Sequence, residues 1–129
     1  MLKHIKSLLV RNSFLIAVSL TLIIAYLSLS KPIEIDIPIK ITFLDKILHA
    51  SAYFTLTVSW LFALRKKSNF KLISIVLFLY GILMEFLQGW LTTTRQKDIY
   101  DVFANSLGIV ISLFVFDYFY KYLKKIFDS

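Results

Sequence analysis

The sequence contains no cysteine, only three glycines and two prolines, and comparatively few charged residues. The lack of cysteine excludes disulfides, thiolate metal sites and cysteine nucleophiles. Glycine-rich phosphate loops, internal repeats and low-complexity tracts are also missing. Charged residues make up 18% of the chain, whereas they make up about 25% of a typical soluble domain. These absences exclude thiol-dependent and disulfide-stapled classes of protein.

Hydrophobic residues are abundant instead. They account for 58% of the 129 residues, and the mean hydropathy is +0.74. A chain this small has too little interior to bury so much apolar surface, so the excess must face lipid. The composition therefore predicts one all-α membrane domain spanning residues 1–129, with no second, soluble domain.

Four long apolar runs predict a bundle of four transmembrane helices, at about residues 13–29, 46–64, 72–91 and 99–119. At about 1.5 Å per residue, such runs cross most of a hydrocarbon core about 30 Å thick. The first run has an alternative interpretation as a cleaved signal peptide, because a basic start precedes it and small residues stand near Ser28 and Ser30. Its length, and the need of the remaining chain for a membrane, favour a retained helix.

Between the first two runs, isoleucine alternates with other residues from Ile33 to Ile41. This period of two places the isoleucines on one side of an extended segment. Pro38 lacks a backbone donor, which makes a central strand of a sheet improbable. We expect an extended flap that lies on the membrane surface or over the mouth of the bundle.

The distribution of lysine and arginine predicts the orientation. Ten of these residues lie in the N-terminal segment, the loop between the second and third runs, and the C-terminal segment, and five lie on the other side. The excess places both termini in the cytoplasm and residues 30–44 and 92–98 outside. The chain is thus expected to be a multi-pass protein of the cell (inner or cytoplasmic) membrane. Topology and anionic membrane lipids account for the net charge of +7, so no nucleic-acid partner is expected.

Polar residues interrupt the apolar runs near their outer ends, at helical spacing. Asp45, His49 and Tyr53 are four apart, Glu85 and Gln88 are three apart, and Asp101, Asn105 and Gly108 follow at i, i+4 and i+7, with Arg95 in the loop above. An ionisable group at the centre of a membrane helix costs about 2.5–3.5 kcal/mol, so such groups usually face a cavity or one another. The spacing therefore predicts one polar site at the outer end of the bundle.

Each residue also has a structural interpretation. Asp101 suits the start of a helix because of the helix dipole. Asn105 and Gln88 are amides of the kind that bond helices together in membranes, and Gly108 permits close packing. Arg95 can neutralise the carboxylates beneath it, and Tyr53 suits packing. The occurrence of all these residues at one depth favours a functional site over these separate explanations.

The order Asp45-Lys46-x-x-His49-x-x-x-Tyr53, Glu85-x-x-Gln88, Arg95 and Asp98-x-x-Asp101-x-x-x-Asn105-x-x-Gly108 resembles the VanZ-like membrane proteins, over roughly residues 43–110. These are small bacterial integral membrane proteins. The founding member is linked to low-level resistance to the glycopeptide antibiotic teicoplanin. The resemblance implies a cell-envelope setting and a link to antibiotic resistance, but it brings no enzyme class.

Two hypotheses remain open. In the first, the cluster binds the headgroup of an envelope lipid or an amphiphilic antibiotic. Arg95, helped by Lys46, would bind a phosphate or carboxylate, and polar side chains would orient it. In the second, the protein is an intramembrane hydrolase or transferase acting on a lipid-linked phosphate. His49 with Glu85 or Asp101 would be a general-base pair, or these groups with Asp45 would hold Mg²⁺. The candidate binding residues are Asp45, Lys46, His49, Glu85, Gln88, Arg95, Asp101 and Asn105, and the sequence identifies no cofactor.

Overall fold

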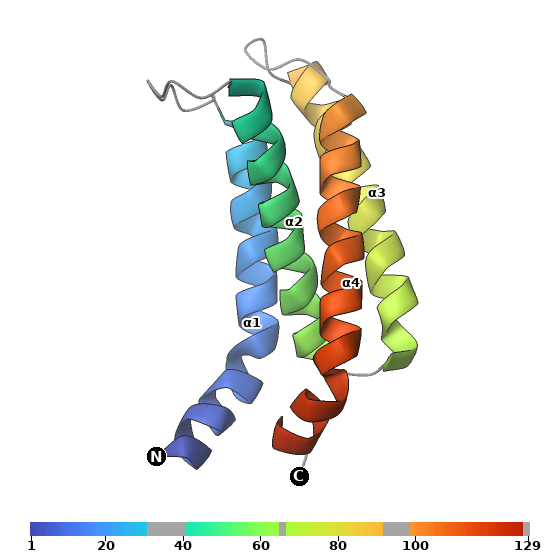
Figure 1. Cartoon of the computed structure of the whole chain (residues 1–129). Helices are drawn as coiled ribbons and strands as arrows, with labels where there is room; N and C mark the ends of the chain where they lie inside the picture. The colour runs from blue at the N-terminus through green and yellow to red at the C-terminus, as the bar shows by residue number, and fades with distance from the viewer. Residues whose placement is uncertain (31–40, 65–66, 92–98, 128–129) are drawn as a thin grey trace.

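The computed structural model describes residues 1–30, 41–64, 67–91 and 99–127, and in these ranges the chain is helical almost throughout. The long helices are α1 (Leu2–Leu29), α2 (Ile41–Leu64), α3 (Phe70–Leu91) and α4 (Ile99–Phe127), and a short 3-10 helix, η1 (Lys67–Asn69), precedes α3 (Figure 1). The predicted all-α architecture with four helices is therefore confirmed.

All four long helices are long and apolar enough to cross a membrane. Their outward faces carry large apolar side chains, among them Leu22, Phe103 and Phe114, each of which is more than half exposed. Water-soluble proteins rarely expose apolar surface on this scale, whereas lipid accepts it. The chain is thus a helical protein of the multi-pass membrane type.

All four long helices extend beyond the predicted bounds: α2 begins at Ile41 instead of residue 46, α3 begins at Phe70 instead of residue 72, and α1 and α4 differ the most. α1 begins at Leu2 instead of residue 13, and α4 continues to Phe127 instead of ending near residue 119. Hydropathy marks only the part of a helix that lies in hydrocarbon, whereas lysine, leucine and isoleucine sustain a helix beyond it. Lys124 and Lys125 in the last turn of α4 also interact favourably with the helix dipole. Of the predicted flap, residues 33–40 lie outside the described ranges, and Ile41 is the first residue of α2.

Helices α2 and α4 form the closest pair. A side chain at Gly108 of α4 would place its Cβ only 2.2 Å from the carbonyl oxygen of Ala50 on α2. The two backbones meet here because glycine has no Cβ, as at small-residue contacts between membrane helices. The close approach fixes how the polar residues on either side of it face each other.

The first helix is held against α2 and α3 by hydrogen bonds to Thr21. The Trp60 indole of α2 donates to the Thr21 hydroxyl at 2.9 Å, and the Tyr80 hydroxyl of α3 donates to the Thr21 carbonyl at 2.6 Å. Phe14 also meets the Trp60 ring edge to face at 5.4 Å. Thus α1 is a packed member of the bundle.

The interior differs between the two ends of the molecule. Both termini lie at one end (Figure 1), and the core towards that end is apolar, with Leu61, Phe70, Ile73 and Phe116. Asp101, Asn105, Glu85 and Gln88 are buried nearer the opposite end. The bundle therefore has an apolar end beside its termini and a polar end away from them.

Candidate functional site

Five polar side chains meet at the end of the bundle opposite the termini. We call them the mouth cluster: Asp45, Lys46 and His49 from the start of α2, and Asp101 and Asn105 from the start of α4. Because α2 and α4 both begin here, one turn of each helix suffices to bring the five residues together. Helical spacing predicted that these residues would lie at the same depth.

Lys46 connects the carboxylates of the cluster. Its ammonium group forms an ion pair with Asp101 across the two helices and another, at 3.3 Å, with its neighbour Asp45. Asp101 is only 6% exposed, and a carboxylate buried to that degree needs such a partner. Asp101 also lies in the first turn of α4, where the helix dipole favours it. Asp101 can therefore stabilise the start of α4 and take part in the mouth cluster at the same time.

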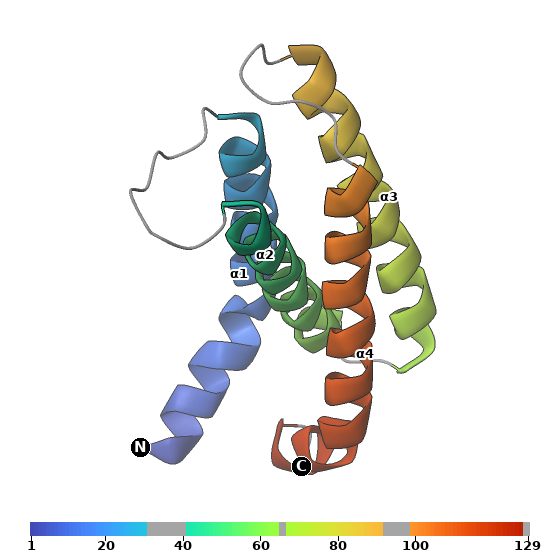
Figure 2. The ribbon, with the colours of Figure 1, turned by 45° about the horizontal axis from the view of Figure 1, so that its top comes forward.

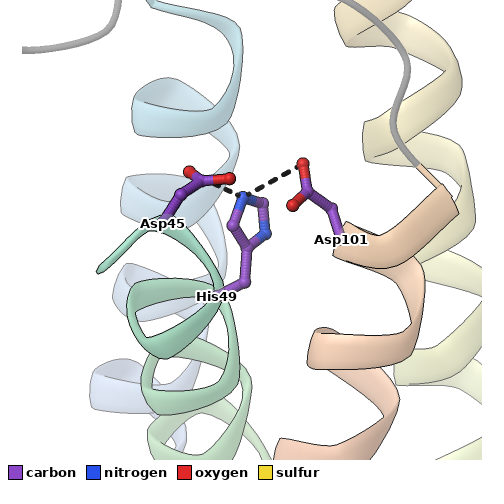
Figure 3. Close-up of side chains that lie close together, drawn as sticks. All are labelled: Asp45, His49 and Asp101. Carbon is purple, nitrogen blue, oxygen red and sulfur yellow. Dashed lines mark ion pairs between the residues drawn. The ribbon is translucent and has the colours of Figure 1, made fainter. Parts of the chain in front are cut away.

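His49 lies between the two carboxylates (Figure 3). Its Nε2 is 3.6 Å from Asp45 Oδ1 and 3.5 Å from Asp101 Oδ2. Its Nδ1 is 3.0 Å from Asn105 Oδ1. Since an amide oxygen only accepts hydrogen bonds, this contact requires the proton on Nδ1. Nε2 is then the nitrogen that can exchange a proton or bind a cation in front of the carboxylates.

The balance of charge decides what the cluster attracts. Two carboxylates face one ammonium group, so with a neutral imidazole the mouth cluster carries a formal charge of −1. It remains partly open, because the side chains of Asp45 and Lys46 are 39% and 23% exposed. A ligand can therefore approach from this side, and it meets groups of both signs.

The two candidates on α3 are buried in the same half of the molecule. Gln88 is 2% exposed, and its amide donates to the Ser28 carbonyl at 2.7 Å, which connects α3 to α1. Glu85, one turn before Gln88 on the same helix, is 3% exposed. The bond to Ser28 gives Gln88 a role in holding α1 against α3 at the polar end.

The remaining candidate, Arg95, lies outside the described residues, so its pairing with the carboxylates stays a prediction. Within the described part of the chain, Asp101 is paired with Lys46. From the sequence, Lys46 was expected only to assist Arg95 in binding an anion. Its position beside Asp45 and one turn before His49 was a signal for this larger role.

Tyr53 has a buried hydroxyl group that its sequence pattern, read as packing, did not predict. It is 2% exposed, as expected for a packing residue, yet its hydroxyl has no hydrogen-bond partner among the described residues. A Cβ on Gly81 would lie 3.3 Å from both the Tyr53 ring and the Asn105 amide nitrogen, so these groups touch α3 directly beneath the cluster. The signal was its spacing, since Tyr53 follows His49 by four residues. Its hydroxyl is a polar group available deeper in the site.

Three residues of the cluster also resemble a ligand set for a metal ion. Donor atoms of Asp45, His49 and Asp101 all lie within 4.8 Å of one another. Two carboxylates suit an oxygen-preferring ion such as Mg²⁺, whereas one histidine supplies a zinc site poorly. The ammonium group of Lys46 already pairs with both carboxylates and offsets one of their two charges, so a cation would have to compete with it.

The fold and the site together define a class: a small protein of the multi-pass membrane type, with four helices and a polar cluster at one end. The chain belongs to the VanZ/LLP1 family, whose model matches residues 3–120 of the 129. No curated protein and no solved structure was found to be similar to the chain.

Proposed function

We propose that the protein binds the headgroup of an envelope lipid or of another amphiphile at the mouth cluster. The observation that supports this most is the convergence of Lys46, His49 and Asn105 with two carboxylates where α2 and α4 begin. Ligand sites are typically apolar cavities with a few convergent polar groups, and here lipid tails supply the apolar surroundings. Membership of the VanZ/LLP1 family supports a setting in the cell envelope.

The chemistry of the cluster favours a headgroup that carries both hydrogen-bond donors and an anion. The anion, a phosphate or carboxylate, would exchange for an aspartate on Lys46, assisted by Arg95. Donors of the ligand would bond to Asp45, the more exposed carboxylate. His49 and Asn105, whose Nδ1 and Oδ1 atoms are 3.0 Å apart, would together orient the headgroup. The orientation set by the ten-to-five distribution of lysine and arginine would place this site outside the cytoplasm.

One observation favours a second candidate, an intramembrane hydrolase or transferase acting on a lipid-linked phosphate. Asp45 and Asp101 would hold a divalent cation over the phosphate, and Nε2 of His49, left free of the cation, would accept a proton from the attacking water. None of the five cluster residues is a serine, threonine or cysteine, so water would be the nucleophile. Because Lys46 occupies the place between the carboxylates, we favour the binding function.

The test is native mass spectrometry of the gently solubilised protein with three separate probes: phosphatidylglycerol, undecaprenyl phosphate and teicoplanin. We expect one of them to be retained, and Asn105→Ala and His49→Ala to weaken retention by about five- to tenfold, as the loss of one hydrogen bond predicts. Ser106→Ala is the matched control, because its hydroxyl bonds only to the carbonyl of Val102 in its own helix.

Three outcomes separate the alternatives. Equal retention by Asn105→Ala, His49→Ala and Ser106→Ala would mean that the cluster is a structural clasp and would contradict the binding function. Stoichiometric Mg²⁺ or Mn²⁺ in the purified protein, together with metal-dependent release of phosphate from undecaprenyl pyrophosphate, would replace binding with the enzymatic alternative. Retention that is lost in the two cluster variants alone would support the proposal.

A further inference from the structure

A second feature lies at the other end of the molecule, beside the termini. It is an open groove of about 620 Å³ between α1 and α4, with α2 as its floor. Figure 2 shows the first half of α1 leaning away from the last half of α4, with α2 between them. The lining is almost wholly apolar: Leu9 and Ile16 of α1, Phe54 and Phe62 of α2, and Phe119 and Tyr122 of α4 are among its residues.

The two serines that line the groove, Ser13 on the α1 wall and Ser59 on the α2 floor, do not change its apolar character. The Ser13 hydroxyl donates to the Val10 carbonyl at 2.9 Å, and the Ser59 hydroxyl donates to the Thr55 carbonyl at 2.8 Å. Both hydroxyls are thus satisfied within their own helices, and each side chain adds only small bulk. A hydrocarbon chain can therefore lie against them without leaving a polar group unbonded.

The length of the groove matches one leaflet of a membrane. On α4 its lining runs from Val115 to Ile126, about 16 Å along the helix axis. Half of a hydrocarbon core about 30 Å thick is about 15 Å. The groove is open to the side and begins at the end of the bundle that carries the termini. Its length therefore matches that of an acyl chain reaching from the nearer headgroup layer to the middle of the membrane.

Basic residues stand at the end of the groove where a headgroup would lie. On α1, Lys6 precedes the lining residues Leu9, Ser13 and Ile16 on the same helix face, and it is half-buried. On α4, Lys125 lies one turn after the lining residue Tyr122 and directly before the last lining residue, Ile126. The two lysines belong to the helices that form opposite walls of the groove, α1 and α4, so each wall carries one basic residue near this end.

We infer that the groove between α1 and α4 binds a phospholipid with an anionic headgroup, its acyl chain against α2 and its phosphate between Lys6 and Lys125. The apolar lining selects a hydrocarbon chain, and the basic end selects an anion over a zwitterion. This site is separate from the mouth cluster and does not depend on the function proposed for it. Its occupant is a lipid of the leaflet on the side of the termini.

The experiment uses the full-length protein in vesicles that contain a photoreactive diazirine lipid, with the probe in the acyl chain of either phosphatidylglycerol or phosphatidylcholine. Cross-linked residues are mapped by mass spectrometry. We expect adducts on Phe54, Phe62 and Phe119, at least about tenfold more frequent with phosphatidylglycerol. Adducts spread evenly over outward residues such as Val76 and Leu79 on α3, which face lipid generally, would overturn the inference.

Two sets of variants separate the groove from general lipid contact. Ser59→Phe fills the groove and should abolish the groove adducts, whereas Ser74→Phe, a serine on α3 whose hydroxyl also bonds within its helix, should leave them unchanged. If Ser59→Phe lowers the melting temperature, the charge variants decide. The double variant Lys6→Gln with Lys125→Gln should lower the ratio of phosphatidylglycerol to phosphatidylcholine adducts at least about tenfold. The control double variant Arg11→Gln with Lys71→Gln removes equal charge away from the groove and should leave this ratio unchanged.

Two further results of these experiments would contradict the proposed lipid or its position in the groove. An unchanged preference in Lys6→Gln with Lys125→Gln would contradict the proposed phosphate position. Adducts that join the lining residues to a second protein chain, in place of lipid, would mean that another copy covers the groove and would overturn the lipid assignment.

Discussion

At the scale of single residues, the ammonium group of Lys46 has the most consequential position in the polar end. It pairs with a buried carboxylate from one helix and a partly exposed one from another, and His49 contacts both of these carboxylates. Buried ion pairs contribute little net stability, because desolvation offsets their attraction, but losing one partner leaves an uncompensated charge. Such an arrangement suits a site in which a ligand or a second cation exchanges with the lysine.

This position leads to a prediction for Lys46→Gln. The variant leaves Asp45 and Asp101 facing each other without their cation. Removing one partner of a fully buried pair costs about 3–5 kcal/mol, and we expect somewhat less here because the Asp45 side chain is 39% exposed. The free energy of unfolding, measured by denaturant titration in mixed micelles, should fall accordingly. The exposed Lys71→Gln should change it by no more than about 0.5 kcal/mol.

A double-mutant cycle isolates the ion pair. Adding Asp101→Asn to Lys46→Gln removes the stranded charge and should recover much of the lost stability, so the two substitutions should be non-additive by about 0.5–3 kcal/mol. Additive losses would show that Lys46 and Asp101 are energetically independent.

At the scale of helices, the contact between α2 and α4 positions the mouth cluster. Gly108→Ala should force the two backbones apart, because its Cβ would lie 2.2 Å from the Ala50 carbonyl oxygen. Overpacking of this kind costs about 1–3 kcal/mol, which the same unfolding titration would measure. Gly89→Ala on the exposed face of α3 is the control and should be neutral or slightly stabilising. Equal effects at the two glycines would contradict a close α2–α4 contact.

The helices and the faces that meet could be predicted from the sequence, whereas the helix bounds and the side-chain pairings could not. Four apolar runs predicted four helices, and the four-residue spacing from Asp45 to His49 and from Asp101 to Asn105 predicted the faces that meet. Hydropathy did not predict the bounds of α1 and α4, since it reports lipid exposure and helices continue through the interface. Spacing within a helix also does not say which side chain crosses to which neighbour. The pairing of Lys46 with Asp101, and of Gln88 with Ser28, therefore required the three-dimensional arrangement.

At the scale of the whole molecule, the bundle divides into two chemically different ends. One end carries the termini, an apolar core and a groove with basic residues at its edge, and the other carries the mouth cluster between α2 and α4. Each end would meet a different leaflet of a membrane. The proposed function places headgroup binding at the polar end, and the further inference places a structural or regulatory lipid at the other.

The most direct test of this account is cysteine labelling of the otherwise cysteine-free chain with a membrane-impermeant maleimide. Three single variants are compared in intact and permeabilised cells: Asp45→Cys in the mouth cluster, Ser68→Cys in η1, and Ser112→Cys buried in α4. We predict that Asp45→Cys reacts in intact cells, Ser68→Cys only after permeabilisation, and Ser112→Cys in neither. Labelling of Ser68→Cys but not Asp45→Cys in intact cells would contradict the account, because the polar site would then face the cytoplasm.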